Sequence, residues 1–287
     1  MKNPATKTAL GPMVIVAVGQ NENPPLNQDE LAYKILPVSG KVTVIAAKWR
    51  PLGRLLIGAT EKKIPGLWAS MLCRKRYIDE KLQGADSQID AAVILGAGFD
   101  TRAYRLPVLA ETPVYELDLP TNIERKRTRL TKLFDEVPAN VTLVPIDFET
   151  QDLADILADH GYRPERPTFF VWEAVTQYLT EPGVRKTFDF LATAAVGSHL
   201  VLTYVRKDFL DGTALYGGEN AYQEFVVKRQ LWHFGMNPDH VAKFLADYGW
   251  SETEQMGPQE FTDRYLRPSG RVLPVSEIER SVYARKI

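Results

Sequence analysis

The 287-residue chain has one cysteine, four histidines and almost no net charge. The single cysteine, Cys73, excludes an internal disulfide and is typical of the reducing cytosol, so we predict a cytoplasmic protein. The histidines do not stand at metal-ligand spacing with Cys or Asp, and we expect no metal site. A formal charge of −1 gives no reason to expect a nucleic acid or a membrane as partner.

Long hydrophobic runs are also missing, because no segment approaches the roughly 20 apolar residues of a membrane helix. Residues 2–19 carry two lysines before a short apolar stretch. That stretch follows Pro12 and leads to no clear small-residue cleavage site. We therefore predict an N-terminal helix that packs on the domain. Apolar residues make up 45% of the chain, which is enough for a full core.

The most informative segment is a strand, a glycine turn and a helix start between residues 91 and 106. Residues 91–95 are an unbroken apolar run, as in a parallel strand covered on both faces. Gly96 and Gly98 then allow a tight turn that a ligand can approach, because neither has a Cβ. Asp100 and Thr101 are candidate caps for the following helix. This arrangement is typical of the nucleotide-binding edge of an α/β sheet.

Acidic residues follow the next predicted strands at the same edge. Asp118 ends a short strand roughly 20 residues after the glycine turn, where such units place an acid that accepts from both ribose hydroxyls. Asp147 and Phe148 follow a third apolar strand, where an acid can accept from an adenine amino group. Glu173 follows a fourth strand, residues 168–172. Each of these acids could instead be an ordinary residue of a solvated loop.

This edge predicts the cofactor. The third glycine of a dinucleotide-binding turn would fall at Thr101, and the turn itself has no Arg or Lys to hold a pyrophosphate. Several acids instead suit a ligand with an adenosine at one end and a cationic reactive group at the other. S-adenosyl-L-methionine has both and carries no phosphate, and we predict it as the cofactor.

Four segments resemble the leucine carboxyl methyltransferase-like O-methyltransferases. Residues 94–106 (ILGAGFDTRAYRL) resemble their first motif, and residues 114–120 (VYELDLP) the second. Residues 172–179 (WEAVTQYL) and 74–79 (RKRYID) resemble two further motifs. The likeness covers roughly residues 70–205. It is strongest to the small-molecule branch of tetracenomycin-type polyketide carboxyl methyltransferases, which implies a role in secondary metabolism.

The resemblance implies a role for each matching residue. Arg74 would bind the methionine carboxylate and Glu173 its ammonium group. Some members add a first-helix lysine, and here only Lys7 is near that place. The implied cofactor-binding residues are Arg74, Gly96, Ala97, Gly98, Asp118, Leu119, Asp147, Phe148, Glu173 and Ala174.

The predicted fold is α/β: a class I methyltransferase (Rossmann-like) sheet of seven mostly parallel strands in a single domain. Residues 1–88 form an N-terminal helical cap, and residues 89–205 form the cofactor-binding core. Residues 206–250 form a lid, with an aromatic helix over residues 222–234, and a further helix. Residues 251–287 supply C-terminal strands, the last of them antiparallel. The sequence does not decide between a monomer and a dimer.

The acceptor side offers four candidates for binding or catalysis: Tyr178, Tyr204, Arg206 and His233. Tyr178 could equally be a packing aromatic, and His233 could equally be a packing residue of the lid. We predict a methyltransferase acting on a carboxylate or hydroxyl of a small molecule. A carboxylate acceptor needs no general base, whereas a phenol would, and His233 would then serve. The alternatives are an NAD-dependent oxidoreductase and a non-catalytic cofactor-binding protein.

Overall fold

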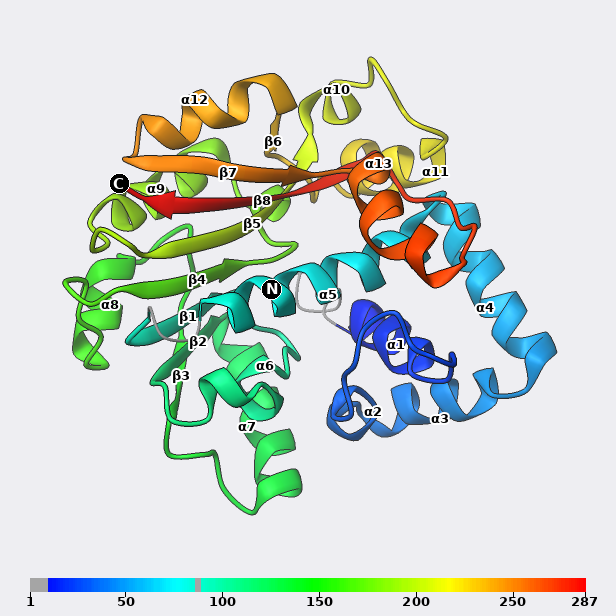
Figure 1. Cartoon of the computed structure of the whole chain (residues 1–287), viewed down its shortest axis with the longest axis horizontal. Coiled ribbons are helices and arrows are strands. Elements are labelled where there is room, and N and C mark those ends of the chain that lie inside the picture. The colour runs from blue at the N-terminus through cyan, green and yellow to red at the C-terminus, as the bar shows by residue number, and fades with distance from the viewer. Residues whose placement is uncertain (1–9, 86–88) are drawn as a thin grey trace.

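The computed structural model describes residues 10–85 and 89–287. A mostly parallel sheet forms its centre, with the strand order β3-β2-β1-β4-β5-β8-β7 (Figure 1). The last strand of the chain, β8, is antiparallel to β5 and β7, as predicted. The short β6 pairs with the end of β5. The strands are β1 (Ala91–Leu95), β2 (Val114–Asp118), β3 (Val141–Pro145), β4 (Thr168–Trp172), β5 (His199–Arg206), β6 (Gly235–Met236), β7 (Trp250–Met256) and β8 (Glu279–Lys286).

The central strand β1 is apolar throughout, since helices cover both faces of the sheet. In β1, Val93 pairs with Tyr115 on one side and Phe170 on the other. The even-numbered residues Ala92 and Ile94 pack into one core with α5, α6 and α7. The odd-numbered residues of β1 pack into a second core with α8, α9 and α12. These helices are α5 (Leu67–Gly84), α6 (Arg102–Arg105), α7 (Pro120–Phe134), α8 (Leu153–Asp159), α9 (Glu181–Ala192) and α12 (Val241–Ala246).

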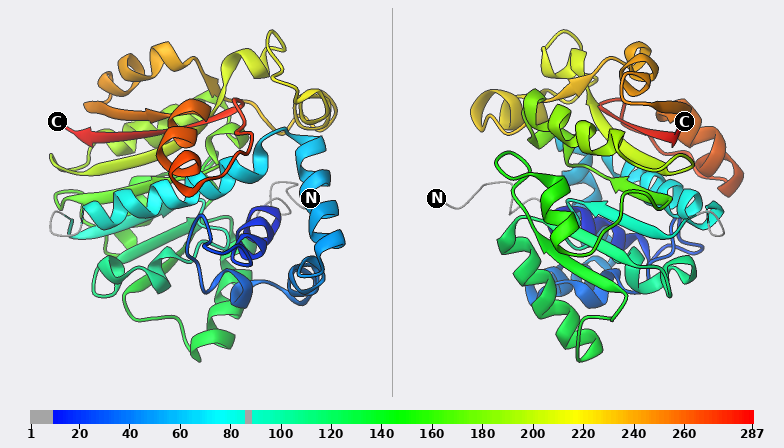
Figure 2. Two further views of the ribbon diagram at one scale, coloured as in Figure 1. Left: turned by 45° about the vertical axis from the view of Figure 1, so that its right-hand side comes forward. Right: turned by 90° about the vertical axis from the view of Figure 1, so that its left-hand side faces the viewer.

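The predicted cap is helical in its described part, residues 10–85. Helices α1 to α4 lie at the edge of the molecule towards which β4 points, and α5 runs back across one face of the sheet (Figures 1 and 2). The long α5 thereby brings residues of the cap to the carboxyl ends of the strands. The cap helices are α1 (Leu10–Gly19), α2 (Ala32–Ile35), α3 (Val38–Ala47) and α4 (Arg50–Lys63).

The chain after β5 forms α10 (Lys207–Leu210), α11 (Glu219–Ala221) and a π-helical stretch, Tyr222–Lys228. The prediction of one helix over residues 222–234 is therefore wrong. Gln230 has a φ of 46°, a conformation that ends a right-handed helix. The Trp232 ring then folds back to stack on Phe225, with 4.8 Å between the ring centroids.

This segment, residues 222–234, is attached to the cap and to the sheet through its own small core. That core contains Ile64 at the end of α4 and Val205 of β5, with Phe209, Phe225 and Trp232. A short helix, α13 (Pro258–Phe261), packs with α5 on the other side of the molecule. Within the described part of the chain, no helix has both the length and the hydrophobicity needed to span a bilayer.

Candidate active site

A cavity of about 620 Å³ lies at the carboxyl ends of β1 to β4. This volume is typical of a small-molecule site. Strand-end loops and α5 supply the inner wall, and α1 and residues 229–233 supply the outer wall. All ten predicted cofactor-binding residues line the cavity: Arg74, Gly96, Ala97, Gly98, Asp118, Leu119, Asp147, Phe148, Glu173 and Ala174.

The turn after β1 depends on its first glycine. Gly96 has a φ of 73°, and a Cβ built there would lie 2.2 Å from Cγ2 of Val175. Any side chain would therefore displace the loop after β4 or the turn itself. After the turn, Asp100 Oδ1 accepts a 2.8 Å hydrogen bond from the Arg102 backbone N–H and caps α6, as predicted. The Thr101 hydroxyl does not cap the helix and donates to Asp29 instead.

Asp118 is buried and joins the glycine turn to the end of β2. Its Oδ2 accepts from the Gly98 N–H at 2.7 Å. Its Oδ1 accepts from the Leu119 N–H at 2.7 Å and from the Asn122 side chain at 2.8 Å. Burial raises the pKa of Asp118, although these three donors act in the opposite direction. A carboxylate has about four acceptor sites, so one remains on Oδ2 for a ligand hydroxyl.

The loop after β3 carries Asp147 and Phe148. Asp147 is half-buried, and its Oδ1 accepts from the Glu149 N–H at 3.0 Å. Phe148 is buried in the core beneath the loop. Glu149 also lines the cavity and accepts from both the N–H and the hydroxyl of Thr180, which tie it to the start of α9. The loop therefore has a fixed shape and presents two carboxylates, Asp147 and Glu149, to the cavity.

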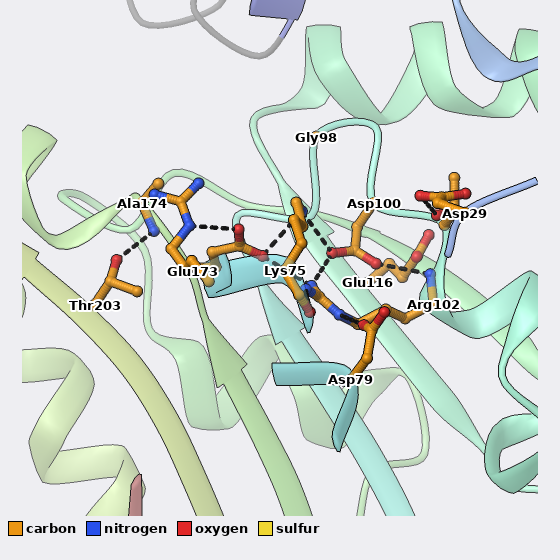
Figure 3. Close-up of polar contacts among 12 residues, drawn as sticks. Asp29, Lys75, Asp79, Gly98, Asp100, Arg102, Glu116, Glu173, Ala174 and Thr203 are labelled. Carbon is orange, nitrogen blue, oxygen red and sulfur yellow. Dashed lines mark hydrogen bonds and ion pairs between the residues drawn. The ribbon is translucent and has the colours of Figure 1, made fainter. Parts of the chain in front are cut away.

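Glu173 lies at the centre of a buried charge cluster (Figure 3). Its Oε1 accepts from Arg74 Nε at 2.8 Å, and its Oε2 accepts from Lys75 Nζ at 2.9 Å and from Arg102 Nη1 at 2.8 Å. Burial alone would raise the pKa of Glu173, but Lys75, Arg102 and Arg74 outweigh it and hold that pKa well below its usual range. Glu173 is therefore ionised, with one acceptor site left for a cationic ligand group.

Helix α5 turns Arg74 inward and Arg76 outward. Arg74 is buried between Glu173 and Glu279, whereas the Arg76 side chain is 41% exposed and pairs with Glu80. Residues that are two positions apart on a helix point about 200° away from each other, which explains why Arg74 is buried and Arg76 is exposed. The hydrogen bonds of Arg74 to other described residues use Nε and Nη1, and none uses Nη2. This nitrogen is available to a ligand carboxylate.

Sequence reasoning missed Lys75 and Arg102 as members of this cluster. Lys75 is buried, lines the cavity and lies 3.6 Å from Asp100 Oδ2 as well as contacting Glu173. Arg102 is fully buried and bridges Glu173 to Asp79 of α5. Residues 74–79 (RKRYID) could have indicated such a cluster, because the carboxylate of Asp79 needs a cationic partner once it is buried.

The four acceptor-side candidates divide into two pairs. Tyr178 and His233 line the cavity, and the His233 side chain is exposed. Tyr204 and Arg206 do not line it. The Tyr204 hydroxyl donates to Gln255 at 2.6 Å, and Arg206 pairs with Asp208 and Glu277.

Two further predictions concern Lys7 and a metal site. Lys7 lies outside the described residues. Within those residues, no group of three or more His, Cys, Asp or Glu side chains could hold a metal ion.

Comparison with known proteins agrees with this geometry. The leucine carboxyl methyltransferase family matches residues 9–192. A Mycobacterium avium (strain 104) protein, named as a candidate S-adenosyl-L-methionine-dependent methyltransferase, is 32% identical over 213 residues, 71% of this chain and 70% of the relative. A similarly named protein of Mycobacterium ulcerans (strain Agy99) is 28% identical over 91% of this chain and 88% of its own length.

Solved structures show the same fold at low sequence identity. A candidate methyltransferase from Thermobifida fusca YX has a TM-score of 0.62 at 16% identity and covers 99% of this chain and 97% of its own. A DUF574-family protein from Streptomyces avermitilis MA-4680 has a TM-score of 0.59 at 13% identity and covers 96% and 97%. The predicted class I methyltransferase fold is thereby confirmed. The chain belongs to the leucine carboxyl methyltransferase family.

Proposed function

We propose that the protein transfers the methyl group of S-adenosyl-L-methionine to an oxygen of a small molecule, a carboxylate or a hydroxyl, in secondary metabolism. Family membership supports methyl transfer from this cofactor. The observation that carries the proposal is the convergence of Arg74, Asp118, Asp147 and Glu173 on one cavity. Their chemistry suits a carboxylate, a ribose, an adenine and an ammonium group, respectively.

The residues around the cavity would hold the cofactor at both ends. Arg74 and Lys75 offer N–H donors to its carboxylate, and Glu173 offers its remaining acceptor site to the ammonium group. Asp118 accepts one ribose hydroxyl, and both only if Gly98 or Asn122 gives up its hydrogen bond. Bound there, S-adenosyl-L-methionine supplies an electrophilic methyl group on a sulfonium. The protein's contribution is then mainly to position the two reactants and to exclude water.

The acceptor would enter beside Tyr178 and His233. A carboxylate acceptor is ionised at neutral pH and needs no base, so methyl transfer to it would not depend on His233. A hydroxyl acceptor must lose its proton, and the exposed imidazole of His233 would accept it. Tyr204 and Arg206 are not part of this proposal, because both side chains are engaged away from the cavity.

Two measurements test the proposal. S-adenosylhomocysteine should raise the midpoint of thermal unfolding, whereas NAD should not, because a ligand that binds only the folded state stabilises it. Labelled methyl transfer to a panel of small carboxylates and phenols should then give an O-methylated product. A shift with NAD alone would support the oxidoreductase. Cofactor binding without transfer to any acceptor would support a non-catalytic protein.

A further inference from the structure

The outer surface of α3 and α4 exposes large apolar side chains. Among the described residues, seven of the twelve exposed large hydrophobic side chains lie between Tyr33 and Leu55. Four of them follow helical spacing along one face of α3 and just beyond its end, opposite the buried Gly40 and Val44. We name the α3–α4 surface by six members: Val38, Val42, Ile45, Trp49, Leu52 and Leu55.

The charged side chains of residues 31–60, the segment that carries the α3–α4 surface, all have one sign. Residues 31–60 contain five cations and no Asp or Glu. None of the five forms an ion pair with a residue in the described ranges 10–85 and 89–287. A net charge of −1 for the whole chain therefore conceals a strongly basic region. The five cations are Lys34, Lys41, Lys48, Arg50 and Arg54.

Apolar side chains surrounded by unpaired cations fit one kind of partner best. A second copy of this chain would bring the same cations into an apolar contact, and like charges at an interface are unfavourable. An anionic bilayer accepts both features, since Trp, Leu and Ile enter the boundary of the acyl chains while Lys and Arg meet the head groups. We propose that the α3–α4 surface docks the protein on an anionic lipid bilayer.

Docking here would place the active-site cavity close to the lipid. The same cap supplies Pro12 and Met13 of α1 to the cavity wall. At the end of α4, Lys63 pairs with Glu224 at 2.9 Å, and Glu224 also contacts Arg229, which lines the cavity. The expectation of no membrane partner came from the net charge, which averages over this local asymmetry.

Vesicle co-sedimentation of the full chain tests the proposal. We expect binding to vesicles of phosphatidylglycerol and phosphatidylcholine at low salt. Binding should fall on pure phosphatidylcholine and at about 0.5 M NaCl, where charges are screened within a few ångströms. Lys48→Glu with Arg54→Glu should weaken binding at least about fivefold for each cation removed. Ile45→Ser with Trp49→Ser should weaken it by about tenfold or more.

Matched variants control for charge and exposure elsewhere. Arg127→Glu with Lys132→Glu removes two exposed cations of α7, and Val196→Ser with Val272→Ser removes two exposed apolar side chains far from α3 in sequence. These variants should bind vesicles like the wild type. All variants should keep the thermal shift with S-adenosylhomocysteine, so a failure of docking is separate from a failure of the proposed function.

Three results would overturn the proposal. In the first, the α3–α4 variants and the control variants bind anionic vesicles equally. In the second, sedimentation shows a dimer that Ile45→Ser with Trp49→Ser converts to a monomer, which makes the surface an interface between two copies. In the third, a monomer remains in the supernatant with both kinds of vesicle, which points to an acidic protein as the partner instead.

Discussion

The backbone N–H of Ala174 donates a 2.8 Å hydrogen bond to the hydroxyl of Thr203. Ala174 has a φ of 56°, which is uncommon for a residue with a Cβ, and it directly follows Glu173. The Thr176 hydroxyl donates to the Thr203 carbonyl at 2.8 Å, on the other side of the same turn. Residue 203 of β5 therefore fixes the turn that places Glu173 in the cavity.

Thr203→Val should disturb both cofactor binding and stability. The substitution leaves the Ala174 N–H without its acceptor, at a cost of about 1–3 kcal/mol. We expect weaker binding of S-adenosylhomocysteine by calorimetry and a lower midpoint of thermal unfolding. Thr203→Ser keeps the hydroxyl and should restore the affinity. A valine variant with unchanged affinity would show that Thr203 does not position the turn.

Arg74→Lys should weaken S-adenosylhomocysteine binding, while Arg76→Lys should not. A lysine at position 74 cannot contact Glu173, Glu279 and a ligand carboxylate together, because it lacks the planar fork of the guanidinium. The loss of one charge-assisted hydrogen bond should weaken binding by about tenfold or more. Arg76 is the matched control, since it is exposed and pairs only along the helix. Equal affinities of the two variants would refute the role of Arg74.

Asp118→Asn should weaken cofactor binding and remove a pH effect. An ordinary aspartate has a pKa near 4. Because burial raises the pKa of Asp118, its carboxylate takes up a proton at a higher pH than that. Protonation removes the charged acceptor, so the affinity of the wild type should fall as the pH is lowered through that raised pKa. The affinity of Asp118→Asn should be lower by about tenfold at neutral pH and should lack this step. Calorimetry between pH 7 and 4 measures both effects.

His199 should make the stability depend on pH. Burial, followed by the charge of Arg285, lowers the pKa of His199 to about 4, and its Nδ1 lies 2.6 Å from the Tyr283 hydroxyl. The unfolded chain takes up the proton near pH 6.5. The free energy of unfolding is thus highest above pH 6.5, where His199 is neutral in both states. It decreases as the pH falls towards 4, by up to about 3 kcal/mol. Urea unfolding should show this slope in the wild type and a flatter one in His199→Gln.

His233→Gln should separate the two kinds of acceptor. If a phenol is the acceptor, the variant loses its base, and the rate should fall by about a hundredfold or more. If a carboxylate is the acceptor, the rate should change little. Single-turnover methyl transfer with saturating cofactor measures the step directly. A large loss with carboxylates would assign His233 to binding or orientation instead.

Much of the cofactor side could be predicted because it depends on local patterns. An apolar run, a glycine turn and an acid at the strand end place Gly96, Asp118, Asp147 and Glu173 at one edge of a parallel sheet. The charge cluster was less predictable. Lys75 meets Glu173 only because α5 crosses the sheet, and no spacing in the sequence encodes that contact.

The acceptor side was predicted less well because it depends on packing. Tyr204 and Arg206 were placed near the lid from their position at the end of β5. In the structure the Tyr204 hydroxyl donates to Gln255 of β7, and Arg206 pairs with Asp208 and Glu277, so neither side chain lines the cavity. The helix predicted over residues 222–234 is interrupted at Gln230, which has a positive φ. The chain turns there, and the Trp232 ring stacks on Phe225.

The two walls of the cavity tolerate change to different degrees. The inner wall is built on strand ends and on a buried charge cluster, where a substitution leaves a charge or a backbone group unpaired. Much of the outer wall is the short loop of residues 229–233, which lies outside the sheet. Redesign for a new acceptor should therefore start with Gln230 and His233, because exchanges there leave Asp118 and Glu173 in place.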